Sequence, residues 1–357
     1  MSKVSLKHTA LVYVIMTIIL SLTLISCDVN VTSNGISTSG MNTTNSNLTD
    51  VGSGTQDVQV FVEPDSGESV ITNAINGAQK SIWVEMYLLT DKKVITALED
   101  AAQRQLDVRV MLEQHPYGGS SISPTETLDK LKAAGIKAAY TNPTFALTHE
   151  KGMVIDSKTT YIMTANLTLS ALGASSYTKN REYGIIDTNP QDVKAVSDIF
   201  TADWNRQDAS LNDTNLVVSP INSRNAFASL INRAHKSLAV EAEEIQDSAI
   251  EQDLVNAAKR GVQVQVILPS PGSSDDSNSK GIHTIESGHV QVKEDKQLYM
   301  HAKIIIVDGQ KAFVGSENIS TASLNRNREL GIIISDQTVL TTLQQTFQQD
   351  WGVSQTA

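Results

Sequence analysis

Two stretches of the chain repeat one pattern, THEKGMVIDSKTTYIMTAN at Thr148–Asn166 and MHAKIIIVDGQKAFVGSEN at Met300–Asn318. Each contains His-x-Lys-x4-Asp and an Asn ten residues after the Asp. The matching positions are His149 and His301, Lys151 and Lys303, Asp156 and Asp308, and Asn166 and Asn318. We infer two copies of one half-site, folded face to face to make a single active site.

Weaker matches extend the repeat over most of the chain. Asn180-Arg181-Glu182-Tyr183-Gly184 corresponds to Asn327-Arg328-Glu329-Leu330-Gly331, and Phe200 and Trp204 correspond to Phe347 and Trp351. A period near 150 residues is too long for a solenoid and indicates duplicated domains.

Hydrophobic periodicity predicts strands alternating with helices in both halves, which is typical of the α/β class. We expect two tandem domains, each a mixed β-sheet flanked by helices, packed as a pseudo-twofold pair. The expected strands are 58–62, 81–88, 108–112, 138–140, 151–155, 160–164 and 183–186, then 215–218, 237–242, 262–268, 290–292, 303–307, 312–314 and 330–334. The expected helices are 66–79, 92–103, 126–134, 190–206, 223–234, 249–260 and 337–349.

Length and composition agree with two globular domains. The chain has 357 residues, of which 40% are hydrophobic and 19% charged, and about 150 residues per domain suggests two domains. We place them at 57–207 and 214–353. The formal net charge of −11 disfavours a general electrostatic grip on nucleic acid or anionic lipid, although a local basic cleft is compatible with it.

Residues 1–27 have the features of a lipoprotein signal peptide. Lys3 and Lys7 precede an apolar run that ends in Leu24-Ile25-Ser26-Cys27, which resembles the bacterial lipobox. That resemblance implies cleavage before Cys27 and lipidation of its thiol, with the mature protein exported and anchored to the bacterial cell membrane. The alternative is a plain membrane anchor. Residues 28–56, rich in Ser, Thr, Asn and Gly, are expected to form a flexible tether.

The paired residues suit phosphodiester chemistry. His149 and Lys151 are two positions apart on a predicted strand, so both side chains point to the same face. Lysine and asparagine side chains can hold the non-bridging oxygens of a phosphodiester. Of two histidines, one can attack phosphorus while the other protonates the leaving group. Glu182 and Glu329 are candidates to orient the two imidazoles.

Asp156 lies at an odd offset from His149, so we expect Asp156 and its counterpart Asp308 to act structurally by holding nearby polar or basic groups. Three glutamates in otherwise apolar strands have two open interpretations, because they could neutralise the site lysines or face solvent at a strand edge. They are Glu85, Glu241 and Glu243.

The doubled His-x-Lys-x4-Asp motif, followed in the second copy by Gly315, Ser316 and Asn318, resembles the phospholipase D superfamily. The resemblance covers nearly all of 58–353. It implies a phosphohistidine intermediate and no requirement for a metal or other cofactor. It also implies His149 as nucleophile and His301 as general acid. The first copy departs from the pattern, since Met163 and Thr164 stand where Gly and Ser are usual; Thr164 keeps a hydroxyl, and Met163 is expected to add bulk near the pocket.

Three functions fit these residues. The first is a phospholipase D-like phosphodiesterase that hydrolyses or transfers phospholipid head groups, working as a monomer with both half-sites in one chain. The second is a metal-independent endonuclease. Removing residues 1–26 leaves 26 basic against 39 acidic residues, a charge of −13 that weighs against nucleic acid. The third is an inactive envelope protein that binds phosphorylated ligands, against which the intact histidines and lysines argue.

Overall fold

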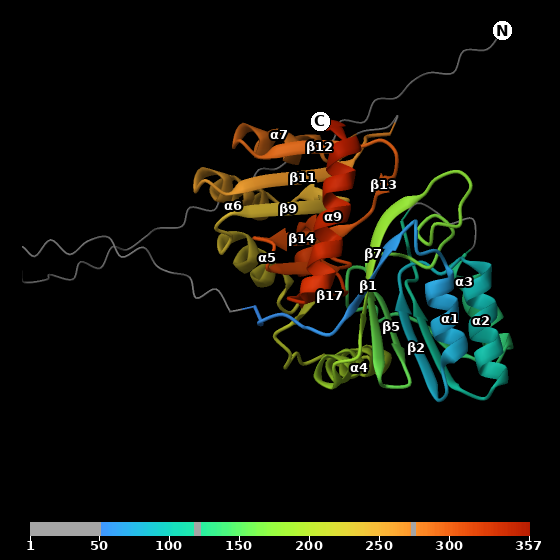
Figure 1. Cartoon of the computed structure of the whole chain (residues 1–357). Coiled ribbons are helices and arrows are strands. Elements are labelled where there is room, and N and C mark those ends of the chain that lie inside the picture. The colour runs from blue at the N-terminus through green and yellow to red at the C-terminus, as the bar shows by residue number, and fades with distance from the viewer. Residues whose placement is uncertain (1–50, 118–122, 273–275) are drawn as a thin grey trace, which may run out of the picture. The chain divides into compact units, whose positions relative to one another are not determined.

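The computed structural model describes residues 51–117, 123–272 and 276–357, and these fold into one compact unit (Figure 1). The predicted signal peptide, Cys27 and most of the predicted tether lie outside the described residues. The part of the chain that the structure describes contains no helix long and apolar enough to cross a bilayer.

The first half forms a mixed sheet in the order β1-β7-β6-β5-β2-β3-β4. Strands β2, β3 and β4 are parallel, and the remaining neighbours are antiparallel. The strands are β1 (Gln59–Glu63), β2 (Ser81–Met86), β3 (Asp107–Leu112), β4 (Lys137–Tyr140), β5 (Lys151–Ile155), β6 (Thr159–Met163) and β7 (Asn180–Asp187). The helices are α1 (Ser69–Gly77), α2 (Lys92–Gln103), α3 (Pro124–Ala133) and α4 (Pro190–Trp204).

The second half repeats this topology in the order β12-β11-β9-β14-β15-β17-β8, with one added edge strand, β18, beside β12. Its strands are β8 (Leu216–Ser219), β9 (Ser237–Ala242), β10 (Ile245–Gln246), β11 (Gln263–Pro269), β12 (Gln291–Asp295), β13 (Tyr299–Met300), β14 (Lys303–Val307), β15 (Lys311–Gly315), β16 (Ile319–Ser320), β17 (Glu329–Ile334) and β18 (Gln355–Thr356). Its helices are α5 (Ser223–Asn232), α6 (Ser248–Lys259), α7 (Ser279–Ser287), α8 (Thr321–Asn325) and α9 (Gln337–Val353). The expected tandem pair of mixed sheets flanked by helices is confirmed.

Alternation along each central strand divides the core into three layers. In β14, Ile305 and Val307 face helices α5–α7, whereas Ile304 and Ile306 face the first half. The same period-two pattern divides β5, because successive side chains of a strand point to opposite faces. Burial on both faces explains the continuous apolar run of β14, and each fully buried isoleucine contributes roughly 1.5–3 kcal/mol to folding.

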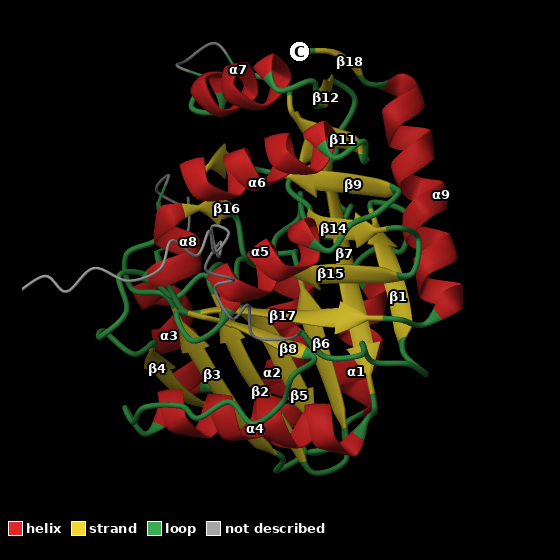
Figure 2. Cartoon of the chain, turned by 90° about the vertical axis from the view of Figure 1, so that its left-hand side faces the viewer, coloured by secondary structure: helices red, strands yellow, loops and turns green. Residues whose placement is uncertain are grey.

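The middle layer joins the two sheets. It contains residues of β5, β6 and β7 together with residues of β14, β15 and β17, and helices α4 and α9 complete it. Figure 1 shows α1–α3 on the outer side of one sheet and α5–α7 on the outer side of the other. In Figure 2 the strands of the second sheet run across those of the first. The two motif strands, β5 and β14, are therefore brought into one interior.

The tether predicted at 28–56 ends too late in the sequence, because residues from Gly52 onward are already hydrogen-bonded into the folded unit. Gly52 N donates to Thr214 O at 2.8 Å, and Thr55 N donates to Ile333 O at 2.9 Å. Thr55 Oγ1 also donates to Asp192 Oδ2 at 2.5 Å. Composition did not predict this ordered segment, because its small residues are held by hydrogen bonds rather than by burial of large side chains.

Candidate active site

Short pairings between the halves set the position of each motif histidine. In β13, just before His301, Tyr299 N donates to Lys179 O at 3.0 Å, so β13 lies parallel to the start of β7. In the equivalent place, His149 N donates to Arg328 O at 2.9 Å. Each histidine is therefore placed beside the Asn-x-Glu segment of the other half.

The result is two crossed His–Glu pairs. His149 Nδ1 lies 3.1 Å from Glu329 Oε2, and His301 Nδ1 lies 2.9 Å from Glu182 Oε2 and 2.7 Å from Glu182 Oε1. Both glutamates are fully buried. The expectation that Glu182 and Glu329 face the imidazoles agrees with this geometry, and the exchange between halves is a new feature.

Each orienting glutamate is itself held by neutral donors. Thr164 Oγ1 donates to Glu182 Oε2 at 2.6 Å, and Ser316 Oγ donates to Glu329 Oε2 at 2.7 Å. Asn180 Nδ2 and Asn327 Nδ2 donate to the other carboxylate oxygens at 2.9 and 3.2 Å. The threonine therefore replaces the serine of the second copy without loss of this contact.

The motif lysines are buried beside the histidines. Lys151 Nζ donates to His149 O at 2.5 Å, and Lys303 Nζ donates to His301 O at 2.7 Å. Burial, followed by the charge of Lys303, lowers the pKa of Lys151 from 10.5 to about 7. The two half-sites thus share one electrostatic environment, in which a bound anion would stabilise both ammonium groups.

The two asparagines follow the next strand in each half and are buried. Asn318 Nδ2 donates to Glu243 Oε2 at 3.3 Å. Among the described residues, Asn166 Oδ1 and Asn318 Oδ1 have no hydrogen-bond partner. Buried amide oxygens normally find partners, so these two retain capacity for a ligand or water.

The motif aspartates lie away from the histidines, as their odd offset predicts. Asp156 accepts from the backbone N–H groups of Gln79, Lys80 and Ser81. Asp308 accepts in the same way from the three residues before and at the start of β9. Both aspartates have left-handed φ, 55° and 54°. Each carboxylate fixes the loop that leads into a central strand.

Met163 does not add bulk to the site. Its side chain is fully buried in the apolar core between the first sheet and helices α1–α3. The prediction of bulk near the pocket is therefore wrong, because the side chain points to the helix-facing side of β6.

The family model described as "Cardiolipin synthase, PLD-like domain" matches residues 71–204 and 227–351, one segment in each half. The chain belongs to the phospholipase D superfamily.

Relatives in this superfamily cover much of the chain. A cardiolipin synthase of Clostridium perfringens is 24% identical over 347 residues, which is 83% of this chain and 71% of that protein. A phospholipase D of Rickettsia conorii is 34% identical over 130 residues, which is 35% of this chain and 60% of that protein. The solved phosphatidylserine synthase of Haemophilus influenzae has the same fold, with a TM-score of 0.68 at 15% identity over 85% of this chain and 88% of that one.

Three side chains in this phospholipase D-type site were not assigned a definite role from the sequence. Glu243 follows β9 and contacts Lys303, Tyr87 follows β2 and packs on His149, and Tyr299 precedes His301. For Glu243, neutralisation of a site lysine was one of the two open interpretations, and it is the correct one. The sequence signal that could have identified Tyr87 and Glu243 is their position at the end of a predicted strand.

Glu85 and Glu241 fit neither interpretation, because both are buried in ionic clusters behind the site. Glu241 Oε2 accepts from Tyr183 OH at 2.7 Å. Oxygens of Glu85, Glu150 and Asp203 lie within 4.8 Å of one another, which is ligand spacing for a metal. Arg328, however, already pairs with Asp203, and burial raises the pKa of Glu150 to about 8. The guanidinium therefore already offsets part of the negative charge that a metal ion would balance.

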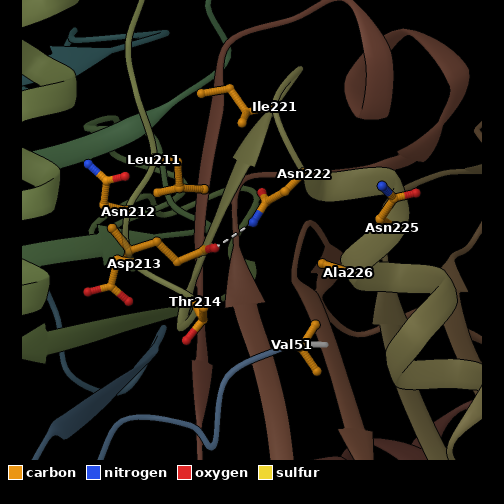
Figure 3. Close-up of a pocket in the computed structure, with 10 residues that line it drawn as sticks. Val51, Leu211, Asn212, Asp213, Thr214, Ile221, Asn222, Asn225 and Ala226 are labelled. Carbon is orange, nitrogen blue, oxygen red and sulfur yellow. Dashed lines mark hydrogen bonds between the residues drawn. The ribbon is translucent and has the colours of Figure 1, made fainter. Parts of the chain in front are cut away.

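A separate cavity of about 320 Å³ lies at the connection between the halves (Figure 3). Residues 211–214 and the start of α5 line it, and Asn222 Nδ2 donates to Leu216 O at 2.9 Å beside it. None of the candidate catalytic residues lines this cavity.

Proposed function

We propose that the chain is a phospholipase D-type phosphodiesterase that acts on phospholipid head groups through a phosphohistidine. The observation that carries the proposal is the pair of crossed His–Glu contacts, because they aim two imidazoles from different halves into one site beside two buried lysines. Lys151, Lys303, Asn166 and Asn318 would bind the non-bridging phosphoryl oxygens.

His149 is the nucleophile in this mechanism. Glu329 accepts from Nδ1–H, which leaves the lone pair on Nε2. Burial, followed by the charge of Lys151, lowers the pKa of His149, so the neutral ring is present at neutral pH. Nε2 attacks phosphorus, a P–N bond forms, and the bond from phosphorus to the head-group oxygen breaks.

His301 acts as the general acid. Its Nδ1 faces Glu182, and its Nε2 lies 3.4 Å from Glu243 Oε2. A ring with carboxylates at both nitrogens suits the imidazolium, which donates from both. His301 gives its proton to the leaving alkoxide. It then takes a proton from water or an alcohol, whose oxygen attacks phosphorus and releases His149.

Transfer and hydrolysis differ only in that second nucleophile. The relatives named as cardiolipin synthases support an alcohol acceptor, and those named phospholipase D support a phospholipid substrate. The lipobox-like sequence at Cys27 supports a location outside the cytoplasm, on the membrane that holds the substrate. The function would need one chain, and neither metal nor cofactor enters any step.

The test is a substrate panel with the full-length protein. Vesicles of phosphatidylcholine, phosphatidylglycerol or cardiolipin, and DNA and RNA in parallel, are incubated with and without glycerol and a chelator, and products are identified by mass spectrometry. We expect chelator-resistant head-group release or exchange that is lost in His149→Ala. Cleavage of DNA or RNA with no change in any lipid would instead establish the nuclease. If neither lipid nor nucleic acid is turned over, the third function is favoured, namely a protein that binds phosphorylated ligands without catalysis.

A further inference from the structure

The carboxylate of Glu243 lies among groups that would bind phosphate. Its Oε2 accepts from Lys303 Nζ at 2.8 Å and from Asn318 Nδ2 at 3.3 Å. The same oxygen is 3.4 Å from His301 Nε2. Three donors that the proposed mechanism assigns to the phosphoryl group and leaving oxygen therefore converge on one carboxylate oxygen.

The other half-site is built differently at this point. Tyr87 follows β2 as Glu243 follows β9, and β2 and β9 pair in the same way with the motif strands. The Tyr87 ring lies 4.7 Å from the His149 ring, edge to face, and Lys151 Nζ lies 5.1 Å from the Tyr87 ring centroid. The repeat thus has an aromatic ring in one half-site and an anion in the other.

The Glu243 side chain is partly exposed. It is 20% exposed, whereas the Lys303 side chain beneath it is 1% exposed. Its second oxygen, Oε1, accepts from Tyr299 OH at 3.1 Å, and Tyr299 is 42% exposed. The carboxylate is therefore held between the buried lysine and a hydroxyl at the surface.

The surroundings of Glu243 favour its ionised carboxylate. Burial favours the neutral carboxyl, but the charges of His301 and Lys303 outweigh burial and hold the pKa of Glu243 well below its ordinary value. A phosphoryl oxygen that approaches the same donors meets a full negative charge. Because like charges in one desolvated site repel strongly, carboxylate and phosphoryl oxygen would exchange with each other.

We propose that Glu243 is a specificity-determining internal anion, which occupies the phosphate position of the second half-site until a phosphodiester displaces it. This inference rests on the proposed function and deepens it. Displaced toward Tyr299, the carboxylate stays close to the bound phosphoryl group. It therefore discriminates by charge, favouring a diester with one negative charge over a monoester or inorganic phosphate.

The discrimination has a chemical use. A phosphomonoester carries about −1.5 to −2 charges at pH 7, since its second pKa is about 6, whereas a diester carries one. Hydrolysis of a phospholipid head group leaves such a monoester on the lipid. Glu243 would expel that product and keep free phosphate out, while admitting the substrate.

The experiment measures inorganic phosphate binding at pH 7.5 by ³¹P NMR titration in the full-length protein, in Glu243→Gln and in Glu243→Ala. Glu286→Gln, on the exposed side of α7, is the control with the same change of charge. We expect both Glu243 variants to bind phosphate at least about tenfold more tightly than wild type, and the control to match wild type. Two variants are used so that a folding defect in one leaves the other informative.

A second readout uses turnover. In Glu243→Gln the ratio of the phosphate inhibition constant to the diester KM should fall by about tenfold, which a merely structural role would not produce. Phosphate affinity unchanged or weaker in both variants would overturn the proposal. Tighter phosphate binding without turnover of any diester in wild type would uphold the internal anion and reject the proposed function instead.

Discussion

His149 Nδ1 lies 3.1 Å from Glu329 Oε2, although 180 residues separate them and each belongs to a different half. The reciprocal pair, His301 and Glu182, is separated by 119 residues. Neither half therefore contains both a motif histidine and the carboxylate that contacts it. The site requires both copies of the repeat, and the packing of one sheet on the other determines its geometry.

The crossed pairing can be observed without a substrate. We predict that Glu329→Gln moves the ¹⁵N resonances of the His149 ring, because the charged acceptor at Nδ1 becomes a neutral amide, and leaves those of His301 nearly unchanged. Glu182→Gln should do the reverse. The measurement is ¹H–¹⁵N NMR of histidine side chains, assigned with His149→Ala and His301→Ala. A shift confined to the histidine of the same half would contradict the crossed arrangement.

The pH dependence of kcat/KM should be bell-shaped. Activity rises as pH passes upward through the lowered pKa of His149, because the nucleophile must be neutral. It falls as pH rises through about 7, where Lys151 loses the proton that makes it a cation. The alkaline limb of kcat should lie higher, because a bound phosphoryl group raises the lysine pKa.

Lys151→Arg provides the matching check on that assignment. An arginine stays protonated at all accessible pH values, so the alkaline limb of kcat/KM should move upward by more than one pH unit, even where the rate itself is lower. An alkaline limb that stays in place in this variant would assign it to another group.

Buried ion pairs between the halves predict a large effect on stability. Arg181 Nε and Nη2 lie 2.5 and 2.7 Å from the carboxylate of Asp350 on α9. Removing one partner of such a pair typically costs about 3–5 kcal/mol, so Asp350→Ala should lower the urea midpoint strongly. The control is Asp198→Ala at the exposed Lys194–Asp198 pair, for which less than about 0.5 kcal/mol is expected. Equally small shifts of the urea midpoint in both variants would show that the Arg181–Asp350 pair adds little to the stability of the packing between the halves.

The motif aspartates should affect folding rather than chemistry. Asp156→Ala removes the acceptor of three backbone N–H groups and places alanine at a φ of 55°. We predict a loss of about 1–3 kcal/mol in unfolding free energy. Asp156→Asn should lose less, because asparagine keeps an oxygen acceptor and tolerates left-handed φ. Calorimetry of both variants checks the order, and an asparagine variant as unstable as the alanine variant would contradict it.

Much of the fold was accessible from the sequence because the repeat could be checked against itself. The bounds of β5, β9, β14 and α2 agree with the predicted ranges, since strong apolar runs or a capping aspartate delimit them. Helix α7 was missed, because it follows a stretch rich in Ser, Gly and Asp and buries only Gly281, Ile282 and Ile285.

The site was accessible only in part for a different reason. His149, His301 and their lysines could be found because they occur twice. Which glutamate serves which histidine could not, because Glu182 and Glu329 are chemically equivalent and the packing of the two sheets decides between them. Glu243 was ambiguous because its counterpart in the repeat is Tyr87.

The most direct test of the account is to trap the covalent intermediate. Full-length protein is mixed with a phospholipid labelled in the part that stays on phosphorus, quenched with alkali, and mapped by mass spectrometry. We predict an acid-labile, base-stable adduct on His149 in wild type and none in His149→Ala. Turnover should be lost in His149→Ala, which lacks the nucleophile, and in His301→Ala, since loss of acid–base transfer typically costs about 10²–10⁴-fold. An adduct on another residue, or full turnover in either variant, would contradict the account.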